Sequence, residues 1–387
     1  MRILIAHSFY RLPGGEDRYV RQQVELLGRD HVVHLEERVN AELPAGPSTA
    51  VKMVRAPHER TAIRRAIRAF LPDVIHLHNP YPAMGPEVHL AARAAGIPLV
   101  QTAHNFRLRC PNGLLFTEGL PCGRCVRGRY DQAVRHACFP SRAQAAAYAS
   151  ALWFNRFVLR LDDRVDLFVA PSRFIHGRLV KWGIPPERTT VVRNFTVPPV
   201  DPPPLGSQGL YLGRLAAEKG IGVLLEALRL AGDPPFAIIG EGPEASDLIR
   251  RATQLGLRNT RFPGAIPADR VPEVIAAARF SVIPSIWDEN APLAALEAMA
   301  AGRPIIASNV GGLTELAADR RGMLVPPGDP DALAGAMRRY ATDEASSLDD
   351  GARARAFVLA ECSPEGHLAG LEAAYALARE SLRARLA

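Results

Sequence analysis

The sequence predicts an α/β fold with two domains, each built around a parallel sheet. Short apolar runs alternate with longer amphipathic runs along most of the chain, which is the pattern of strands connected by helices. The 387 residues are enough for two or three domains with cores of their own. Ligands of doubly wound sheets bind beyond the carboxyl ends of the strands, so we expect functional residues in the turns after the apolar runs.

A proline-rich stretch divides the chain near its middle. Residues 198–204 read Pro-Pro-Val-Asp-Pro-Pro-Pro, which favours a stiff, extended segment. We therefore expect a first domain at residues 1–197, a linker at 198–207 and a second domain at 208–363, followed by a C-terminal helix at 364–387.

The order of the elements follows from the alternation. In the first domain the predicted strands are residues 2–6, 31–35, 50–54, 73–79, 97–105, 165–170 and 190–194. The predicted helices between them include residues 59–70, 86–95 and an amphipathic stretch at 143–161. In the second domain we expect strands at 210–213, 236–240, 260–262, 281–284, 304–307 and 323–326. Both sets indicate strand-helix repeats and hence parallel sheets.

Composition and charge narrow the function classes. Hydrophobic residues make up 48% of the chain and charged residues 22%, no run reaches the length of a membrane span, and residues 1–6 read as a strand rather than a signal peptide. We expect a cytoplasmic protein. Aromatic residues are only 6% and are not interleaved with basic ones, so no nucleic-acid partner is expected.

The net charge of +7 arises in the first half of the chain. Its most concentrated basic patch is Arg60, Arg64, Arg65 and Arg68, with apolar residues at helical spacing between them. This patch is either the solvated face of an ordinary helix or a contact for lipid phosphates. In the second case the protein is peripheral at the inner face of a membrane.

Two strand-turn-helix stretches in the second half carry paired charges. In one, the apolar run 280–285 leads to Glu289 and then to an Ala/Leu-rich helix with Glu297. Backbone N–H groups at the start of this helix, around Asn290, Ala291, Pro292 and Leu293, suit a phosphate, and a cleft-facing carboxylate suits sugar hydroxyls. The alternative is a surface helix on which both glutamates are ordinary charges.

The other stretch is residues 209–220, where Gly213, Arg214 and Lys219 lie in the turn after a strand. A nucleotide diphosphate needs cations that bridge its oxygens, and an arginine with a lysine supplies them. The chain has only three lysines, Lys52, Lys181 and Lys219. A lysine at this position therefore indicates a specific role.

These stretches, with residues 239–244 (Ile-Gly-Glu-Gly-Pro-Glu) and 308–315 (Ser-Asn-Val-Gly-Gly-Leu-Thr-Glu), resemble the family 4 retaining glycosyltransferases. The resemblance covers most of the chain and implies the GT-B fold, in which two Rossmann-like domains face each other across a cleft. It also implies that the C-terminal helix crosses back onto the first domain. Each motif alone is weak, whereas four in this order are specific.

The resemblance assigns roles to individual residues. Arg214 and Lys219 bind the donor diphosphate, Glu289 contacts hydroxyls of the transferred sugar, Glu297 holds the ribose, and the turn at Gly213 and residues 290–293 completes the donor site. His104 lies beside the transferred sugar, and Gly14 and Gly15 contact donor phosphate or acceptor; a Gly-Gly pair is also common in a plain turn. No catalytic divalent metal is implied, and Asp329-Pro330-Asp331 reads as a helix start.

Four of the five cysteines lie close together. Cys110, Cys122, Cys125 and Cys138 fall within the stretch 106–141, where Cys122 and Cys125 form a Cys-x-x-Cys pair. Without an export signal a disulfide is disfavoured, and four thiolates suggest structural zinc. An iron–sulfur cluster and unligated or redox-active thiols remain alternatives. The stretch resembles an insertion found in a subset of the family.

Taken together, the sequence predicts a retaining, metal-independent hexosyltransferase. The donor is a nucleotide diphosphate sugar, of the UDP or GDP type, and the basic first half favours a lipid-linked or otherwise anionic acceptor in polysaccharide or cell-envelope assembly. Two alternatives remain: another activity on the same fold, such as a nucleotide-sugar epimerase, and a zinc-containing nucleic-acid or regulatory protein on a degenerate transferase scaffold.

Overall fold

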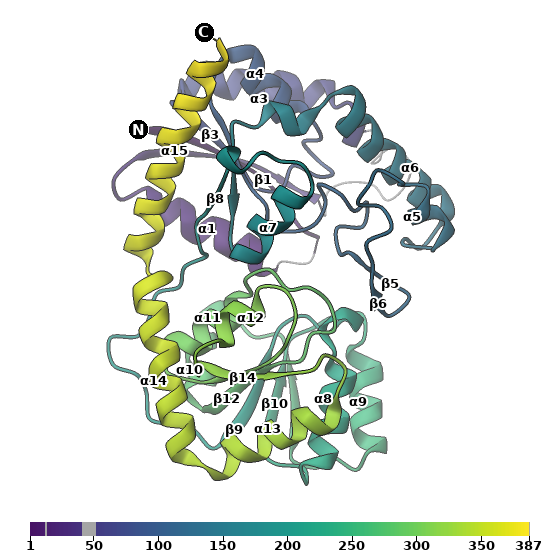
Figure 1. The fold of residues 1–387 in the computed structure, drawn as a ribbon, viewed down its shortest axis with the longest axis vertical. Coiled ribbons are helices and arrows are strands. Elements are labelled where there is room, and N and C mark those ends of the chain that lie inside the picture. Colours follow the sequence, from purple (N-terminus) through teal and green to yellow (C-terminus); the bar gives the residue numbers. More distant parts are fainter. Residues whose placement is uncertain (12–13, 41–51, 387) are drawn as a thin grey trace. The chain divides into compact units, whose positions relative to one another are not determined.

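The chain folds into two compact units, which are described separately. Figure 1 shows the computed structural model, which describes residues 1–11, 14–40 and 52–386. The first unit consists of Met1–Glu118, Cys122–Val192 and His367–Ala387, and the second of Gly119–Pro121 and Arg193–Gly366. The chain therefore leaves the first unit at Val192, five residues before the end of the predicted first domain.

The first unit contains a six-stranded sheet in the order β2-β1-β3-β4-β7-β8. Its neighbouring strands pair in parallel, as the alternation predicted. The strands are β1 (Arg2–Phe9), β2 (Val32–Val39), β3 (Val74–Leu77), β4 (Leu99–Thr102), β7 (Leu167–Ala170) and β8 (Thr189–Val191). Every residue of β3, β4 and β7 is buried, which explains why these segments are mostly apolar.

Helices connect these strands. They are α1 (Gly15–Leu27), α3 (Pro57–Phe70), α4 (Glu87–Ala95), α5 (Gln132–Arg135), α6 (Arg142–Trp153), α7 (Arg173–Lys181) and the short turns η2 (Phe154–Val158), η3 (Leu161–Arg164) and η4 (Pro186–Arg188). The predicted helix at 143–161 is thus α6 followed by the π-helical turn η2.

The C-terminal helix α15 (Pro364–Leu386) supplies the last part of the first unit, from His367 onward. The yellow helix runs beside this unit's sheet in Figure 1. Tyr375 is fully buried, and its hydroxyl lies 2.8 Å from Nδ1 of His76 on β3. The helix therefore contributes core residues to the first unit, as well as surface.

One predicted strand of the first domain is wrong. Residues 52–54 form a helical turn, while residues 50 and 51 lie outside the described residues. The carbonyl oxygen of Met53 accepts a hydrogen bond of 2.8 Å from Asn155 Nδ2, so a side chain from a distant element replaces a strand partner there. A short apolar run is compatible with either a strand or a buried helical segment. The sequence pattern therefore predicted a strand where the chain forms a helical turn.

The second unit repeats the architecture with the strand order β11-β10-β9-β12-β13-β14, again paired in parallel. All six strands predicted for this domain are present. They are β9 (Gln208–Leu212), β10 (Phe236–Ile239), β11 (Thr260–Gly264), β12 (Ala278–Ile283), β13 (Ile305–Ser308) and β14 (Gly322–Val325). The helical segments are η5 (Ala217–Lys219), α8 (Ile221–Leu230), α9 (Ala245–Gln254), η6 (Ala268–Arg270), α10 (Val271–Ala276), α11 (Leu293–Ala300), α12 (Leu313–Ala317), α13 (Pro330–Thr342) and α14 (Glu344–Glu361).

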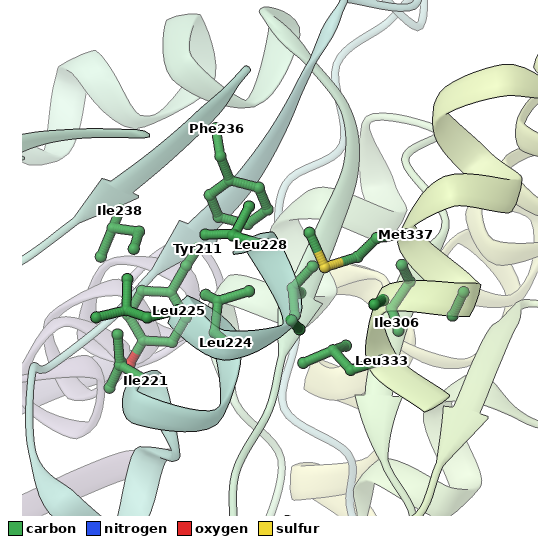
Figure 2. Close-up of a cluster of buried hydrophobic side chains, with 14 of the residues drawn as sticks. Tyr211, Ile221, Leu224, Leu225, Leu228, Phe236, Ile238, Ile306, Leu333 and Met337 are labelled. Atoms are coloured by element: carbon green, nitrogen blue, oxygen red, sulfur yellow. The ribbon is translucent and has the colours of Figure 1, made fainter. Parts of the chain in front are cut away.

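The main core of the second unit lies between its sheet and helices α8 and α13. Figure 2 shows Leu224 and Leu228 of α8 gathered with Phe236 of β10 and Met337 of α13. These side chains are at most 1% exposed. Each such side chain contributes about 1.5–3 kcal/mol relative to its exposed state, so this packing fixes the sheet whose carboxyl ends carry the paired charges.

The proline-rich stretch is held against the second unit by two arginines. Arg303 is 1% exposed, and its guanidinium donates to the carbonyl oxygens of Pro203 and Pro204 at 3.0 and 2.6 Å. Arg355 donates to the carbonyls of Pro199 and Val200 at 2.7 and 3.0 Å. Proline lacks an N–H but keeps its carbonyl, so these donors order a segment that cannot pair as a strand.

Within the part of the chain that the structure describes, no helix combines the length and the apolar character needed to cross a bilayer.

Candidate functional site

The turn after β9 brings two cations to the carboxyl edge of the second sheet. Gly213 follows the strand, Arg214 comes next, and Lys219 ends the short helix η5. Gly220 then takes a left-handed conformation with φ of 69°, and a Cβ on it would lie 2.0 Å from the carbonyl oxygen of Pro284. Only glycine fits this close approach, which puts the turn directly against the end of β12.

Lys219 and Glu289 form the central contact of this edge. Lys219 Nζ donates to Glu289 Oε1 at 2.6 Å, and Ser285 Oγ donates to the same oxygen at 2.6 Å. Lys219 Nζ also lies 5.0 Å from the centre of the Trp287 ring. The structure thus brings together two residues that are 70 positions apart in the sequence and that we predicted to act on one donor.

Glu289 is an ionised carboxylate in this setting. The residue is 5% exposed, and burial on its own favours the neutral acid. The positive charge of Lys219 and the hydrogen bonds from Lys219 and Ser285 outweigh this effect of burial, so the pKa of Glu289 is lowered. The carboxylate is available as a hydrogen-bond acceptor for hydroxyl groups.

Arg214 has a carboxylate partner of its own. Its guanidinium forms an ion pair with Glu218, which is 6% exposed. The Arg214 side chain is 51% exposed, compared with 19% for Lys219, so its fork is open to solvent. Tyr211 fixes the backbone beneath it by donating to the Arg214 carbonyl oxygen at 2.8 Å. Arg214 can therefore reach an anion that lies outside the protein surface.

The Gly-Gly pair of residues 308–315 holds the backbone of Glu289. Gly312 N donates to the Glu289 carbonyl at 2.7 Å. Gly311 has φ of 53°, and a Cβ on it would lie 2.2 Å from that same oxygen. The sequence marked this pair as part of the resemblance without a structural role. Its role is to let the turn after β13 pack against the acid.

The residues before α11 form a partly exposed turn. Asn290, Ala291 and Pro292 are half-buried, and Leu293 is the first helical residue. Pro292 is the N-cap residue, directly before the helix. The first N–H groups of a helix lack partners within it, and the Ala291 carbonyl accepts a hydrogen bond of 3.0 Å from Asn194 Nδ2. This orders the turn that we expect to meet phosphate.

Glu297 and residues 239–244 complete the edge. Glu297 is half-buried on α11, one turn beyond Leu293. The turn after β10 pairs with the Arg214 turn, since Leu215 N donates to Glu241 O at 2.9 Å and Glu244 N donates to Leu215 O at 3.1 Å. The four motifs of the resemblance therefore end at one edge of one sheet.

In the first unit, histidines gather where β1, β3 and β4 end. His104 follows β4, and its Nε2 lies 2.8 Å from Nδ1 of His78. His76 contacts Thr102 Oγ1 at 2.7 Å and Tyr375. Burial lowers the pKa of His104, and nearby histidines add to this effect. The ring is therefore a neutral hydrogen-bonding group.

Gly14 and Gly15 lie at the start of α1. Gly14 is its N-cap, and its N–H donates to Asp17 Oδ2 at 3.2 Å. A Cβ on Gly14 would meet nothing within 4 Å, so close backbone packing does not explain this glycine. Pro13 lies outside the described residues. Glu16 is linked to the His104 loop through Tyr10, whose hydroxyl donates to Glu16 at 2.8 Å and accepts from Asn105 at 3.1 Å.

Sequence reasoning missed the residues that support these side chains. Ser285, Glu218 and Trp287 touch the charged pairs of the second unit, and His78 touches His104. His78, like His104, lies at a strand end, but a single histidine is more often structural. Ser285, Glu218 and Trp287 had no signal of their own.

The four cysteines are free thiols in the structure. Cys110 and Cys125 are buried, whereas Cys122 and Cys138 are half-buried. Burial, followed by the influence of the other three cysteines, raises the pKa of Cys125 to about 12. Cys110 Sγ donates to Asn112 Oδ1 at 2.9 Å, and Cys138 Sγ lies 3.6 Å from Thr117 Oγ1.

Over residues 1–11, 14–40 and 52–386, no group of three or more His, Cys, Asp or Glu side chains has the arrangement of a metal site. The cysteine stretch instead contains the short strands β5 (Phe116–Thr117) and β6 (Leu120–Pro121), together with α5. Cys125 packs with Tyr130 and Leu152 in a small apolar cluster. A zinc site at the four cysteines stays a prediction.

Both units match known protein families. Residues 207–357 match the family described as "Glycosyl transferases group 1", and residues 11–194 match the family described as "Glycosyl transferase 4-like domain". The boundary between the two matches contains the proline-rich stretch.

Individual relatives agree with these families. The 2-deoxystreptamine glucosyltransferase of Streptomyces kanamyceticus is 26% identical over 84% of this chain and 87% of its own length. A putative teichuronic acid biosynthesis glycosyltransferase of Bacillus subtilis is 37% identical over 73% of this chain and 66% of its own length. Among solved structures, Anabaena HepE in complex with UDP and glucose aligns over 96% of this chain and 98% of its own, with a TM-score of 0.68 and 20% identity.

Proposed function

Because this chain belongs to the group 1 glycosyltransferases, we propose that it transfers a sugar from a UDP-sugar, with retention of the anomeric configuration, to a hydroxyl of an anionic or lipid-linked acceptor. The prediction of a glycosyltransferase of the GT-B fold is confirmed by the two family matches and by the structural neighbours. The nucleotide base, the stereochemical outcome and the acceptor belong to the proposal.

The observation that carries the proposal is the contact between Lys219 and Glu289. An ammonium group and an ionised carboxylate lie 2.6 Å apart where a strand ends and the turn before α11 begins. Such a pair can bind both parts of a sugar nucleotide, because the cation attracts phosphate oxygens while the carboxylate accepts hydrogen bonds from sugar hydroxyls. A diphosphate with a neutral sugar at one end matches both halves of the pair.

Charge development explains how this edge favours reaction. When the bond between sugar and phosphate breaks, negative charge grows on the diphosphate. Arg214 and Lys219 stabilise this charge more strongly than that of the intact donor, which is the condition for catalysis. The backbone N–H groups of Ala291 and Leu293 add donors for the distal phosphate, and Glu297 holds the ribose.

The two cations are already balanced by Glu218 and Glu289 in the structure. Diphosphate binding therefore adds net negative charge to the edge, and we expect Arg214 to turn from Glu218 toward the phosphates, since its side chain is half exposed. Lys219 remains beside Glu289 and links the sugar to the diphosphate. In this reaction a donor phosphate oxygen accepts the proton of the acceptor hydroxyl, His104 contacts the sugar, and no catalytic metal takes part.

The acceptor side of the proposal rests on charge. The exposed arginines Arg64, Arg65 and Arg68 of α3 line a surface hollow of about 590 Å³. No carboxylate pairs with them among the described residues. A row of cations of this kind fits phosphate head groups at the face of a membrane. Relatives named for teichuronic acid and colanic acid biosynthesis make cell-envelope polysaccharide assembly the proposed setting.

Structural zinc is also part of the proposal. Cys110, Cys122, Cys125 and Cys138 supply four sulfur ligands, the donor set of closed zinc sites. The Cys-x-x-Cys spacing of Cys122 and Cys125 supports this assignment. When bound, the ion would lock the loop that follows His104, a structural role outside the transfer step.

The experiment is a nucleotide titration followed by a stereochemical assay. UDP, GDP, ADP and TDP are tested for thermal stabilisation of the wild type, an Arg214→Ala/Lys219→Ala variant and an Arg250→Ala/Arg258→Ala control on the exposed surface. UDP at a hundredfold its dissociation constant should add about 2.7 kcal/mol of stability to the wild type and to the control. It should not stabilise the Arg214→Ala/Lys219→Ala variant.

Proton NMR of the sugar released by donor hydrolysis or transferred to an acceptor then gives the anomeric configuration. Retention with release of UDP supports the proposal. Inversion contradicts the proposed mechanism, and a new nucleotide sugar without release of UDP indicates an epimerase. Absence of any nucleotide binding indicates a binding protein on a transferase scaffold.

A further inference from the structure

His78 and His104 are joined by a direct hydrogen bond between their rings. His78 Nδ1 lies 2.8 Å from His104 Nε2, and the two rings are tilted by only 22° with their centres 5.1 Å apart. His78 follows β3 and His104 follows β4, and these strands are neighbours in the sheet. The pair therefore lies within the first unit.

Both rings are neutral. Burial lowers the pKa of His78 and of His104 well below the usual value, and the neighbouring histidines His7, His76 and His367 lower both further. A neutral imidazole has one N–H donor and one acceptor nitrogen. In the bond between the two rings one nitrogen must therefore carry the proton while the other presents its lone pair.

The surroundings of His78 decide the direction of this bond. His78 Nε2 is buried and has no hydrogen-bond partner among the described residues. A buried N–H without an acceptor is the rarer and costlier arrangement, so this nitrogen presents its lone pair. The proton of His78 is then on Nδ1 and is donated to His104 Nε2, which leaves the proton of His104 on its Nδ1.

His78 is itself held in place. Its backbone N–H donates to the Ala6 carbonyl at 3.0 Å, and its ring stacks on His76 with centres 4.4 Å apart. His76 is fixed in turn by Tyr375 and Thr102. A fixed ring can impose an orientation on its neighbour, as a second-layer partner does for a metal-bound histidine.

We propose that His78 is a positioning residue that keeps His104 in the tautomer protonated on Nδ1. On the proposed function, this makes His104 a hydrogen-bond donor toward an oxygen of the transferred sugar. A donor sugar with an oxygen at that place is favoured over its deoxy analogue, because a donor group without an acceptor loses a hydrogen bond.

Nitrogen-15 NMR of histidine-labelled protein tests the tautomer without any substrate. His104 is assigned by comparing spectra of the wild type and a His104→Asn variant. In the wild type we expect the protonated nitrogen of His104 to be Nδ1. In His78→Phe, which keeps an aromatic ring but removes the donor, we expect the Nε2-protonated form to appear. In His78→Asn the amide N–H replaces the lost donor and restores the wild-type pattern.

A wild-type His104 protonated on Nε2 overturns the inference, as does an unchanged His104 pattern in His78→Phe. If His78→Phe does not fold, the spectra of the wild type and His78→Asn still show whether His104 is protonated on Nδ1. Kinetics give the second measurement. His78→Phe should reduce kcat by about 10-fold to 100-fold with an unchanged Kd for UDP, while His78→Asn recovers most of the loss.

The two measurements separate this inference from the proposed function. A wild type without transferase activity but with His104 protonated on Nδ1 contradicts the proposed function and leaves the assigned tautomer correct. Full activity in a His78→Phe protein whose His104 has changed tautomer shows that the tautomer has no role in transfer, and overturns the positioning role.

Discussion

Lys219 and Glu289 form a buried ion pair in which a second donor, Ser285, binds the same carboxylate oxygen. Trp287 is a third hydrogen-bonding neighbour of this carboxylate, and a carboxylate has about four acceptor positions. Glu289 can therefore accept a hydrogen bond from a ligand without breaking its contact with Lys219. On the proposed function, Glu289 stays fixed by Lys219 and Ser285 while it accepts a hydrogen bond from a sugar hydroxyl.

The first prediction concerns this acid. Glu289→Gln keeps the size of the side chain but removes its charge, so it weakens the contact with sugar hydroxyls and releases the Lys219 cation toward phosphate. We expect kcat to fall about 100-fold, as for loss of one transition-state hydrogen bond to a charged group, while the affinity for UDP is kept or increased. Steady-state kinetics and UDP titration measure both.

The matched control is Glu273→Gln, which changes an exposed acid paired with Arg270. It should leave both quantities unchanged. Wild-type turnover in Glu289→Gln would refute the role of Glu289 in sugar binding.

The second prediction concerns the turn that packs on Glu289. Gly311→Ala places a Cβ 2.2 Å from the Glu289 carbonyl oxygen at a residue with φ of 53°, so the backbone must move. The strained backbone alone costs about 1–3 kcal/mol, which lowers the melting temperature by several degrees. Activity should fall along with stability, since the acid moves with its backbone.

Gly335→Ala is the control for this change. Gly335 lies inside helix α13, and a Cβ there would meet nothing within 4 Å. Alanine is favoured over glycine in a helix by about 1 kcal/mol, so the same substitution should stabilise the protein. Equal melting temperatures for the two variants would show that the close contact at Gly311 is absent.

The third prediction is a pH dependence of stability. Burial lowers the pKa of His76 to about 3 and that of His89 to about 4. The unfolded chain binds protons at these histidines near pH 6.5, but the folded protein does not. Below pH 6.5 the unfolded state thus holds more protons, and the free energy of unfolding decreases as the pH falls toward these values.

Each buried histidine contributes up to about 1.4 kcal/mol per pH unit in this window. Urea denaturation between pH 7 and pH 4.5 measures the slope. His89→Gln keeps a partner for Gln101, which lies 3.1 Å from the ring, and should reduce the slope. The same substitution at the exposed His58 is the control. A slope unaffected by His89→Gln would mean that this histidine titrates alike in the folded and unfolded chains.

The fourth prediction tests the cysteines. We expect one zinc ion per chain by elemental analysis, and a lower melting temperature after removal of the metal with a chelator. Cys125→Ser should lose the ion, because it removes one of the four proposed sulfur ligands. Cys362→Ser, at a buried cysteine of the second unit, should keep it. Purified protein without zinc and with four reactive thiols would contradict the zinc site. The apolar cluster around Cys125 and Tyr130 would then be what holds the loop.

Much of the fold and part of the site could be predicted from the sequence. Strands such as β9 and β12 are apolar runs that end at turn residues, so local sequence identified them. Glu289 and Lys219 were identified because charged residues follow such strands and because the motifs around them resemble those of the family 4 glycosyltransferases. Their supporting partners did not stand out, although they are close in sequence: Ser285 lies four residues before Glu289, and Glu218 lies four residues after Arg214. Side-chain contacts within a turn depend on its backbone conformation, which the local sequence does not specify. The wrong strand at residues 50–54 has a different cause, because a short apolar run does not distinguish a strand from a helical turn and Asn155, which binds Met53, is about a hundred residues away.

The last prediction concerns the basic face of α3. Arg64, Arg65 and Arg68 are exposed, whereas Ile63 and Ile67 on the opposite face are buried, so charge can be reversed there without disturbing the core. Each arginine near an anionic surface is worth about 1 kcal/mol. Reversal of all three to glutamate should therefore reduce binding to vesicles of phosphatidylglycerol more than 100-fold, while transfer to a soluble acceptor is kept.

Binding should also weaken as salt is added, because screening acts on exposed charges. The matched control reverses Arg250, Arg258 and Arg261, three exposed arginines of the second unit. Co-sedimentation with vesicles compares the two triple variants at the same net charge, so a general effect of charge would weaken both alike. Loss confined to the α3 variant assigns the membrane contact to this face, and equal binding by both variants would refute it.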